Sequence, residues 1–345
     1  MARARIPLLL LAAAALLLGA CERTPREVLL TGPAMGTTWT LRVVPEEVPA
    51  EPAALRELVQ VTLDEVDLAM STYRPDSAVS QFNASESTGW IEVPPALAGL
   101  VAQALQIGEA TKGAFDITIS PVVALWGFGS AAPRTQPPTD REIAAAQAAT
   151  GQRHLAVQAD PPALRKALPG LTLDLDSIAP GYAVDLVAAR LEAAGQRRYM
   201  IEIGGELRVR GRNAQGQGWR IGIERPDESG RSVERVMQLE AGAVSTSGDY
   251  RDFFESAGIR YSHTLDPRSG RPVAHGLASV TVLRPTAAEA DGIATALTVL
   301  GPTEGFELAE RMGWAALFIE RTPDGFQPRE TGAFAQAAET GESRP

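Results

Sequence analysis

The segment LTLDLDSIAPGYAVDLVAARLEAAG, at residues 171–195, is the most regular part of the sequence and restricts the fold most strongly. Leucine alternates with polar residues over its first six positions, and this period of two predicts a strand. SIAPG predicts a turn, and the residues after it predict a helix that ends at Gly195. A chain built around this unit contains both strands and helices.

Other segments follow one another without the strict alternation of a doubly wound sheet. The patterns predict strands within 28–44, in a hairpin about Gly204 and Gly205, and at 113–130, 218–224 and 279–283. They predict helices at 52–70 and 95–111, from Thr139, and at 285–301, with capping boxes at Thr139/Glu142 and Thr286/Glu289. We therefore expect an α+β fold of mixed sheets with packed helices.

The N-terminal residues have the features of an export signal. Two arginines precede an apolar run at 6–20, which is short for a membrane span and predicts a signal peptide at 1–20. Leu18, Gly19 and Ala20 precede Cys21, the only cysteine, as in a bacterial lipobox, so residues 21–27 are predicted to be a lipidated tether. A plain signal peptide with a chance cysteine is the alternative. The 323–345 stretch predicts a weakly ordered tail.

Composition excludes several classes of function. The formal net charge of -10, with no cluster of Lys or Arg, argues against a nucleic-acid partner. The sequence lacks the glycine motifs of Rossmann and P-loop nucleotide sites, and it lacks GxSxG and HExxH. The remaining candidates for chemistry are oxygen donors and three histidines.

Two groups of oxygen donors are candidates for a site. Asp291 and Thr295 lie four residues apart on one predicted helix face, which suits Mg²⁺ held together with substrate phosphates. Alternatively, Asp291 is simply an acid favoured by the helix dipole. Asp174 and Asp176 share one face of the predicted strand beside a helix start that could receive a phosphate, or they belong to a solvated strand face.

His263 lies in RYSHTLDP, ahead of an Asp-Pro turn signal, and is a candidate general base. The alternative is a core histidine with satisfied hydrogen bonds. His154 and His275 are weaker candidates, because the first precedes an apolar strand-like segment and the second lies in a proline-containing loop.

An ordered series of motifs resembles the ApbE-like FAD:protein FMN transferases, a family of bacterial flavin transferases that are often periplasmic lipoproteins. The matching pieces are MGTTW at 35, MSTYRPDSAVSQFN at 70, GAFDITISPVVALWGFG at 113, LDLDSIAPGYAVD at 173, IEIGGELRVRG at 201, TSGDYRDFFESAGIRYSHTLDPRSG at 246 and AD.IAT at 290–295. The series covers residues 28–322, which would form the flavin transferase domain.

The resemblance implies an ApbE-like fold with an active-site cleft between two lobes. It also implies Mg²⁺ ligation by Asp291 and Thr295, with a main-chain oxygen near Ser177. FAD, as the substrate, would be bound by residues in six segments: Met35, Tyr73, Ala114, Phe115, Asp116, Asp174, Pro180 and Thr264. Many relatives have a lysine where this chain has Pro180, so a side-chain contact to FAD is lost there.

In this family FMN is joined to a threonine of a target protein, and AMP leaves. We expect His263, or alternatively Asp266, to accept the threonine proton. The partner would be an exported or membrane-bound flavoprotein, met on the periplasmic side of a membrane that holds the lipid anchor, with the inner membrane favoured over the outer. A Mg²⁺-dependent FAD pyrophosphatase and a non-catalytic FAD-binding lipoprotein are alternatives.

Overall fold

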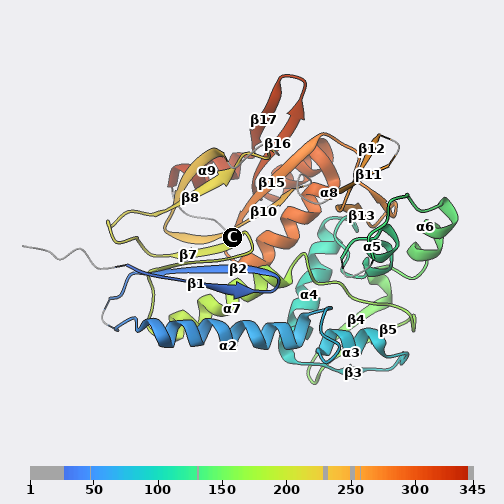
Figure 1. Ribbon diagram of the computed structural model, residues 1–345, viewed down its shortest axis with the longest axis horizontal. Coiled ribbons are helices and arrows are strands. Elements are labelled where there is room, and N and C mark those ends of the chain that lie inside the picture. Colours follow the sequence, from blue (N-terminus) through green and yellow to red (C-terminus); the bar gives the residue numbers. More distant parts are fainter. Residues whose placement is uncertain are drawn as a thin grey trace, which may run out of the picture.

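The centre of the fold is an antiparallel sheet of eight strands (Figure 1). The computed structural model describes residues 27–46, 48–129, 132–227, 232–248, 253–256 and 258–340. The strands lie in the order β1 (Val28–Ala34), β2 (Thr37–Val43), β6 (Tyr199–Ile203), β7 (Glu206–Arg210), β10 (Ala241–Gly248), β15 (Leu277–Arg284), β16 (Ala315–Thr322) and β17 (Gly325–Glu330). The signal peptide and Cys21 lie outside the described residues.

Each face of this sheet is covered by other elements. Helices α7 (Ala179–Ala193) and α8 (Ala287–Met312) pack on one face, and α2 (Pro52–Met70) packs against α7. The other face is covered by the hairpin β8 (Trp219–Glu224) and β9 (Val233–Leu239) and by α9 (Gly332–Thr340), with a separate cluster of buried side chains. Because both faces of the sheet are covered, a strand such as β15 is buried almost throughout, including Ser279 and Thr281.

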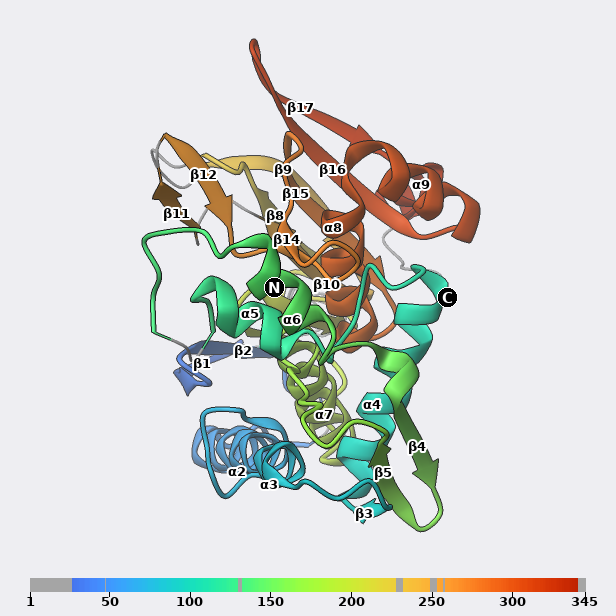
Figure 2. The same cartoon turned by 90° about the vertical axis from the view of Figure 1, so that its right-hand side faces the viewer.

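The rest of the chain forms a second, more helical part (Figure 2). It contains α3 (Ala78–Ala84), α4 (Pro95–Ala110), α5 (Ser120–Trp126), α6 (Asp140–Gln147), the 3₁₀ turn η1 (Gln152–His154) and a small sheet of β3 (Ile91–Glu92), β5 (Pro162–Lys166) and β4 (Leu155–Ala159). Two short hairpins accompany it: β11 (Phe253–Ser256) with β12 (Ile259–Ser262), and β13 (Leu265–Asp266) with β14 (Arg271–Pro272). The predicted α+β class is confirmed.

The segment 171–176 is not a strand, because residues 171–175 have no regular secondary structure and a turn begins at Asp176, so that prediction is wrong. The alternation is nevertheless real, because Leu171, Leu173 and Leu175 are fully buried. Their main chain is held by other groups: the Asn83 side chain bonds both the N–H and the C=O of Leu173, and the N–H of Asp174 donates to the Ile117 carbonyl at 2.7 Å. Side-chain and loop partners therefore replace a sheet neighbour.

Three other predictions are corrected by the structure. Of the predicted strand segment 113–130, the described residues 113–129 form turns and the helix α5 rather than strands. The capping box at Thr139 is confirmed, whereas Thr286 makes no side-chain cap. The tail predicted at 323–345 is wrong for residues 325–340, because β17 extends the sheet and α9 buries Phe334.

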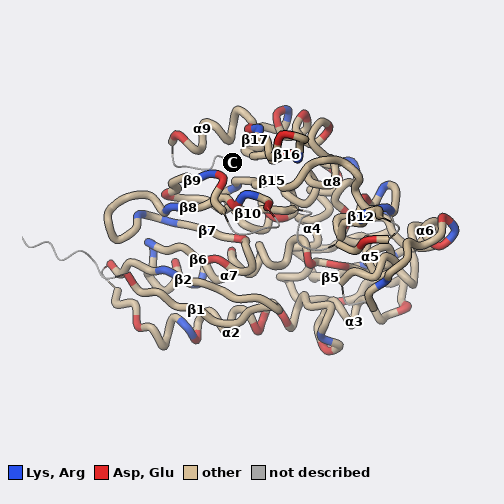
Figure 3. The backbone as a smooth tube through the Cα atoms, turned by 45° about the horizontal axis from the view of Figure 1, so that its top comes forward, with Lys and Arg blue, Asp and Glu red and all other residues tan. Residues whose placement is uncertain are grey.

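Acidic and basic residues are interspersed over the described chain (Figure 3). No helix within the described ranges is long and apolar enough to span a membrane.

Candidate functional site

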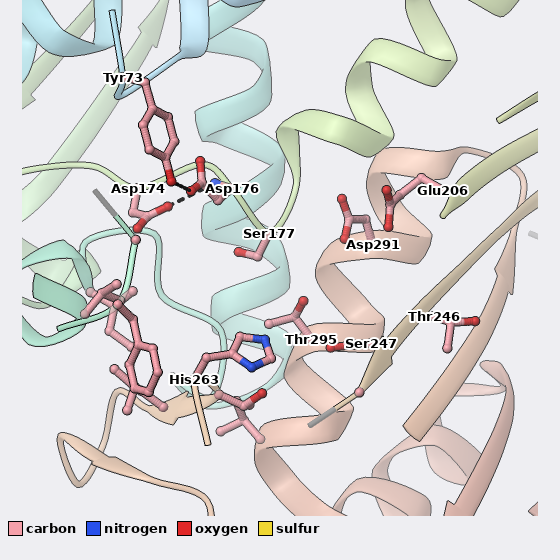
Figure 4. A pocket seen from close by; sticks show the side chains of 18 residues that line it. Tyr73, Asp174, Asp176, Ser177, Glu206, Thr246, Ser247, His263, Asp291 and Thr295 are labelled. Atoms are coloured by element: carbon pink, nitrogen blue, oxygen red, sulfur yellow. Dashed lines mark hydrogen bonds between the residues drawn. The ribbon is translucent and has the colours of Figure 1, made fainter. Parts of the chain in front are cut away.

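A cleft of about 490 Å³ lies where the helical part meets the large sheet, and small-molecule sites commonly have this volume. Its walls come from the 117–129 region, the 174–177 segment, β7, β10, the 263–265 segment and α8. Seven of the predicted site residues line it: Tyr73, Asp174, Ser177, His263, Thr264, Asp291 and Thr295. Figure 4 labels all of these except Thr264 and shows their side chains around one shared space.

Helix α8 brings two oxygen donors to this cleft. The Asp291 side chain is only 7% exposed, and its Oδ2 accepts a hydrogen bond of 3.2 Å from the Gly181 N–H at the start of α7. Burial, and next the nearby Glu206, raise the Asp291 pKa well above its ordinary value, while the Gly181 bond opposes this. A buried carboxylate with one hydrogen bond is a group that a bound cation would stabilise.

Thr295 lies one turn after Asp291, as the spacing predicted. Its hydroxyl has no hydrogen-bond partner among the described residues, whereas the neighbouring Thr298 hydroxyl donates to the Ala294 carbonyl at 2.8 Å. Ser177 faces the same space from the loop before α7 (Figure 4). Carboxylate, hydroxyl and main-chain oxygens are the donors that Mg²⁺ prefers, so these residues fit that ion.

Asp174 and Asp176 form an acidic pair on the wall opposite Asp291. The Asp176 N–H donates to Asp174 Oδ1 at 3.0 Å, and the Tyr73 hydroxyl lies 3.5 Å from Asp176 Oδ2. Desolvation raises the pKa of Asp174, and desolvation followed by the charge of Asp174 raises that of Asp176 to about 7, although Asp176 is exposed to solvent. Because the two carboxyl groups are neighbours, the charge of one disfavours ionisation of the other.

An aromatic cluster supports His263, which lies between β12 and β13. The His263 ring meets Phe128 edge-on with centroids 6.4 Å apart, and Phe128 packs on Phe254. Phe254 in turn stacks on Tyr261 at 5.0 Å. Because these rings bridge the β11–β12 hairpin to the segment after α5, they fix the histidine at the edge of the cleft.

The structure does not bring the other predicted residues into the lining. Ala114 and Phe115 are buried in the main core, and the Asp116 carboxylate binds Thr118 and the Gln152 N–H. Met35 lies at the β1–β2 turn and Pro180 in the first turn of α7. Asp266 is held by Arg268, whose Nε lies 3.0 Å from its Oδ1.

Sequence reasoning missed other residues that line the cleft. Ile119, Val123 and Phe128 form an apolar wall, and Glu206 adds a carboxylate close to Asp291. Burial, then the charge of Glu202, raise the pKa of Glu206 to about 7. The sequence feature that could have identified Glu206 is the Gly204-Gly205 pair directly before it, because a glycine turn fixes the direction of the following side chain.

Comparison with known proteins decides the family. The sequence profile of the ApbE family matches residues 35–318. The chain belongs to the ApbE family. The FAD:protein FMN transferase of Vibrio cholerae is 41% identical over 322 residues, which cover 93% of this chain and 96% of that protein. The enzyme of the same name from Salmonella typhimurium is 43% identical over 330 residues, covering 92% and 93% of the two chains.

Solved ApbE structures have the same fold. The flavin transferase ApbE from Vibrio cholerae superposes with a TM-score of 0.84 at 40% identity, covering 90% of this chain and 99% of that chain. The flavinyl transferase ApbE from Pseudomonas stutzeri gives 0.84 at 44% identity, covering 92% and 98%. The resemblance that the motifs indicated is therefore confirmed, and so is the ApbE-like fold.

Proposed function

We propose that this protein is an FAD:protein FMN transferase that uses Mg²⁺, attaches FMN to a threonine hydroxyl of a target protein and releases AMP. The names of its ApbE-family relatives support the transfer of FMN. The observation that carries the proposal is the cleft, which joins the oxygen donors of α8, the Asp174/Asp176 pair and His263 around one space (Figure 4). Metal donors and a candidate base suit group transfer better than storage.

The reaction exchanges a phosphoanhydride bond for a phosphoester bond. The bond between the FMN phosphorus and the bridging pyrophosphate oxygen breaks, and the oxygen leaves with AMP. A new bond forms from the threonine Oγ to the same phosphorus, and the hydroxyl proton passes to His263. Mg²⁺, held by Asp291, Thr295 and the main chain near Ser177, would neutralise charge on the phosphates.

The protein's own residues contribute position and electrostatics. The cluster that includes Phe128 and Tyr261 holds His263 at the edge of the cleft, where an acceptor threonine can arrive from outside. Tyr73 is 61% exposed beside Asp176 and offers a ring face at the entrance. Alignment of the nucleophile in this way accounts for a large share of catalysis in such reactions.

The test is to incubate purified protein with FAD, Mg²⁺ and a candidate acceptor flavoprotein domain, and to measure intact masses. An FMN adduct on an acceptor threonine, with one AMP per adduct, is the expected result. Free FMN and AMP without an adduct would instead identify a pyrophosphatase. Unchanged FAD that remains bound would identify a flavin-binding lipoprotein and contradict both enzymatic functions.

We also propose that Cys21 carries a lipid that anchors the protein on the periplasmic side, in the inner membrane rather than the outer. The lipobox-like residues before Cys21 support this, and the partner would then be an exported or membrane-bound flavoprotein. Membrane fractionation of a Cys21→Ser variant tests it. We expect the variant to leave the inner-membrane fraction, and retention there would contradict the anchor.

A further inference from the structure

Glu206 lies beside the oxygen donors of α8, although the motif match assigns it no role. It is the first residue of β7 and follows Gly204 and Gly205, whose φ angles are +67° and +119°. These left-handed conformations favour glycine. The turn therefore fixes where β7 begins, and it directs Glu206 into the cleft that Asp291 and Thr295 line.

The Glu206 and Asp291 carboxyl groups face the same small space (Figure 4). Glu206 Oε1 accepts one long hydrogen bond, 3.4 Å, from Ser245 Oγ, and Asp291 accepts one from Gly181. Among the described residues, no ion pair includes either group, and the nearby Arg208 is paired with Asp185 at 2.7 Å. Within the described part of the chain, these two neighbouring carboxylates therefore have no cationic side chain as a partner.

Two carboxylates in a largely buried cleft repel each other unless a positive charge lies between or beside them. Hard divalent cations satisfy such groups, and carboxylates that do not bind the ion directly commonly hold its water ligands. We propose that Glu206 is an additional carboxylate of the divalent-cation site, acting with Asp291 and Thr295. This inference rests on the proposed function, because it concerns the same cation.

The test measures Mn²⁺ binding to purified protein by electron paramagnetic resonance of the free ion, with Mg²⁺ as competitor and without FAD. We expect Glu206→Gln to weaken Mn²⁺ binding about tenfold or more, a typical loss when a carboxylate near a metal is removed. The control for the loss of one negative charge is Glu109→Gln. Glu109 is exposed on α4 and does not line the cleft.

The control should bind Mn²⁺ within about twofold of the wild type, since it loses the same charge without losing a donor in the cleft. Glu206→Gln affinity within twofold of the wild type would overturn the inference, and so would an equal loss in the control. If Glu206→Gln does not fold, Glu206→Asp replaces it. Weaker Mn²⁺ binding by that variant supports the inference, and unchanged binding overturns it.

The same experiment separates this inference from the proposed function. Transfer of FMN by the wild type, together with unchanged Mn²⁺ affinity in the glutamine variant, contradicts the role of Glu206 alone. A wild-type protein that binds neither Mn²⁺ nor Mg²⁺ overturns both the role of Glu206 and the metal dependence of the proposed reaction.

Discussion

The Asp185 carboxylate of α7 caps the N-terminus of α8 by accepting the Ala287 N–H at 2.9 Å. Its second oxygen accepts the Ala288 N–H at the same distance, and Arg208 of β7 neutralises it. The sequence offers Thr286 for this task, but the buried Thr286 hydroxyl has no hydrogen-bond partner among the residues that the structure describes. Because α8 carries Asp291 and Thr295, this cap from another helix helps to set where these two cleft-lining oxygen donors lie.

Replacing Asp185 should therefore destabilise the protein more than replacing Thr286, the residue that the sequence suggests as the cap. In Asp185→Asn the amide presents only one acceptor oxygen to two N–H groups, and Arg208 loses its charged partner. We expect the free energy of unfolding to fall by about 2 kcal/mol. Thr286→Ala should change it by less than about 0.5 kcal/mol, because the hydroxyl makes no cap. Urea unfolding measures both, and equal losses would contradict the assigned cap.

Thr295 and Thr298 offer a matched pair for the metal assignment. Thr295→Val should leave the fold intact and weaken Mg²⁺ binding about tenfold, because its hydroxyl has no partner among the described residues. Thr298→Val removes the buried bond to Ala294, so it should lower stability without affecting the metal. Calorimetric titration with MgCl₂ distinguishes them. Similar Mg²⁺ affinities in the two variants would remove Thr295 from the site.

His263→Ala should leave FAD binding almost unchanged and slow FMN transfer about a hundredfold or more, a typical effect of losing a general base. The readouts are FAD fluorescence for binding and mass spectrometry for single-turnover transfer. His275→Ala is the control, because His275 packs against the Gly301 kink of α8 and does not line the cleft. A transfer rate in His263→Ala equal to that of the wild type would exclude His263 as the base.

Particular residues show how far the sequence could lead. Asp291, Thr295, Asp174 and His263 were predicted as site residues because helical spacing, the motif series and residue scarcity can be read from the sequence, and the structure places all four in the lining of one cleft. The role of Asp185 was missed because the N–H groups that it accepts lie about a hundred residues away in the chain. Likewise, the 171–176 segment has the alternation of a strand, yet its partners are a side chain and a loop carbonyl. Alternating apolar residues therefore indicate that one side of a segment is buried, but they do not indicate whether its main chain pairs with another strand.

Glu206 gives the protein a pH dependence when no metal is bound. Burial raises the pKa of Glu206 to about 7, so the folded state keeps a proton that the unfolded state has released. Stability in chelator should therefore fall as the pH rises from about 4.5 to 7, by at most about 3 kcal/mol from this group. Melting temperatures measured between pH 5 and 8 test this. The melting temperature should decrease less with rising pH in Glu206→Gln than in the wild type, and an equal decrease would exclude Glu206 as its cause.

Gly181 sets how closely α7 approaches α8. A Cβ on Gly181 would lie 2.5 Å from the Ala287 carbonyl oxygen, which is main chain and cannot rotate away. Gly181→Ala should therefore separate the two helix starts, lower the stability by about 2 kcal/mol and weaken Mg²⁺ binding through the lost bond to Asp291.

Gly99 on α4 faces open space, so Gly99→Ala should stabilise by up to about 1 kcal/mol and leave Mg²⁺ affinity unchanged. Urea unfolding and MgCl₂ titration of both variants test the contact, and a Gly181→Ala protein as stable as the wild type would show that the helices tolerate the added methyl group.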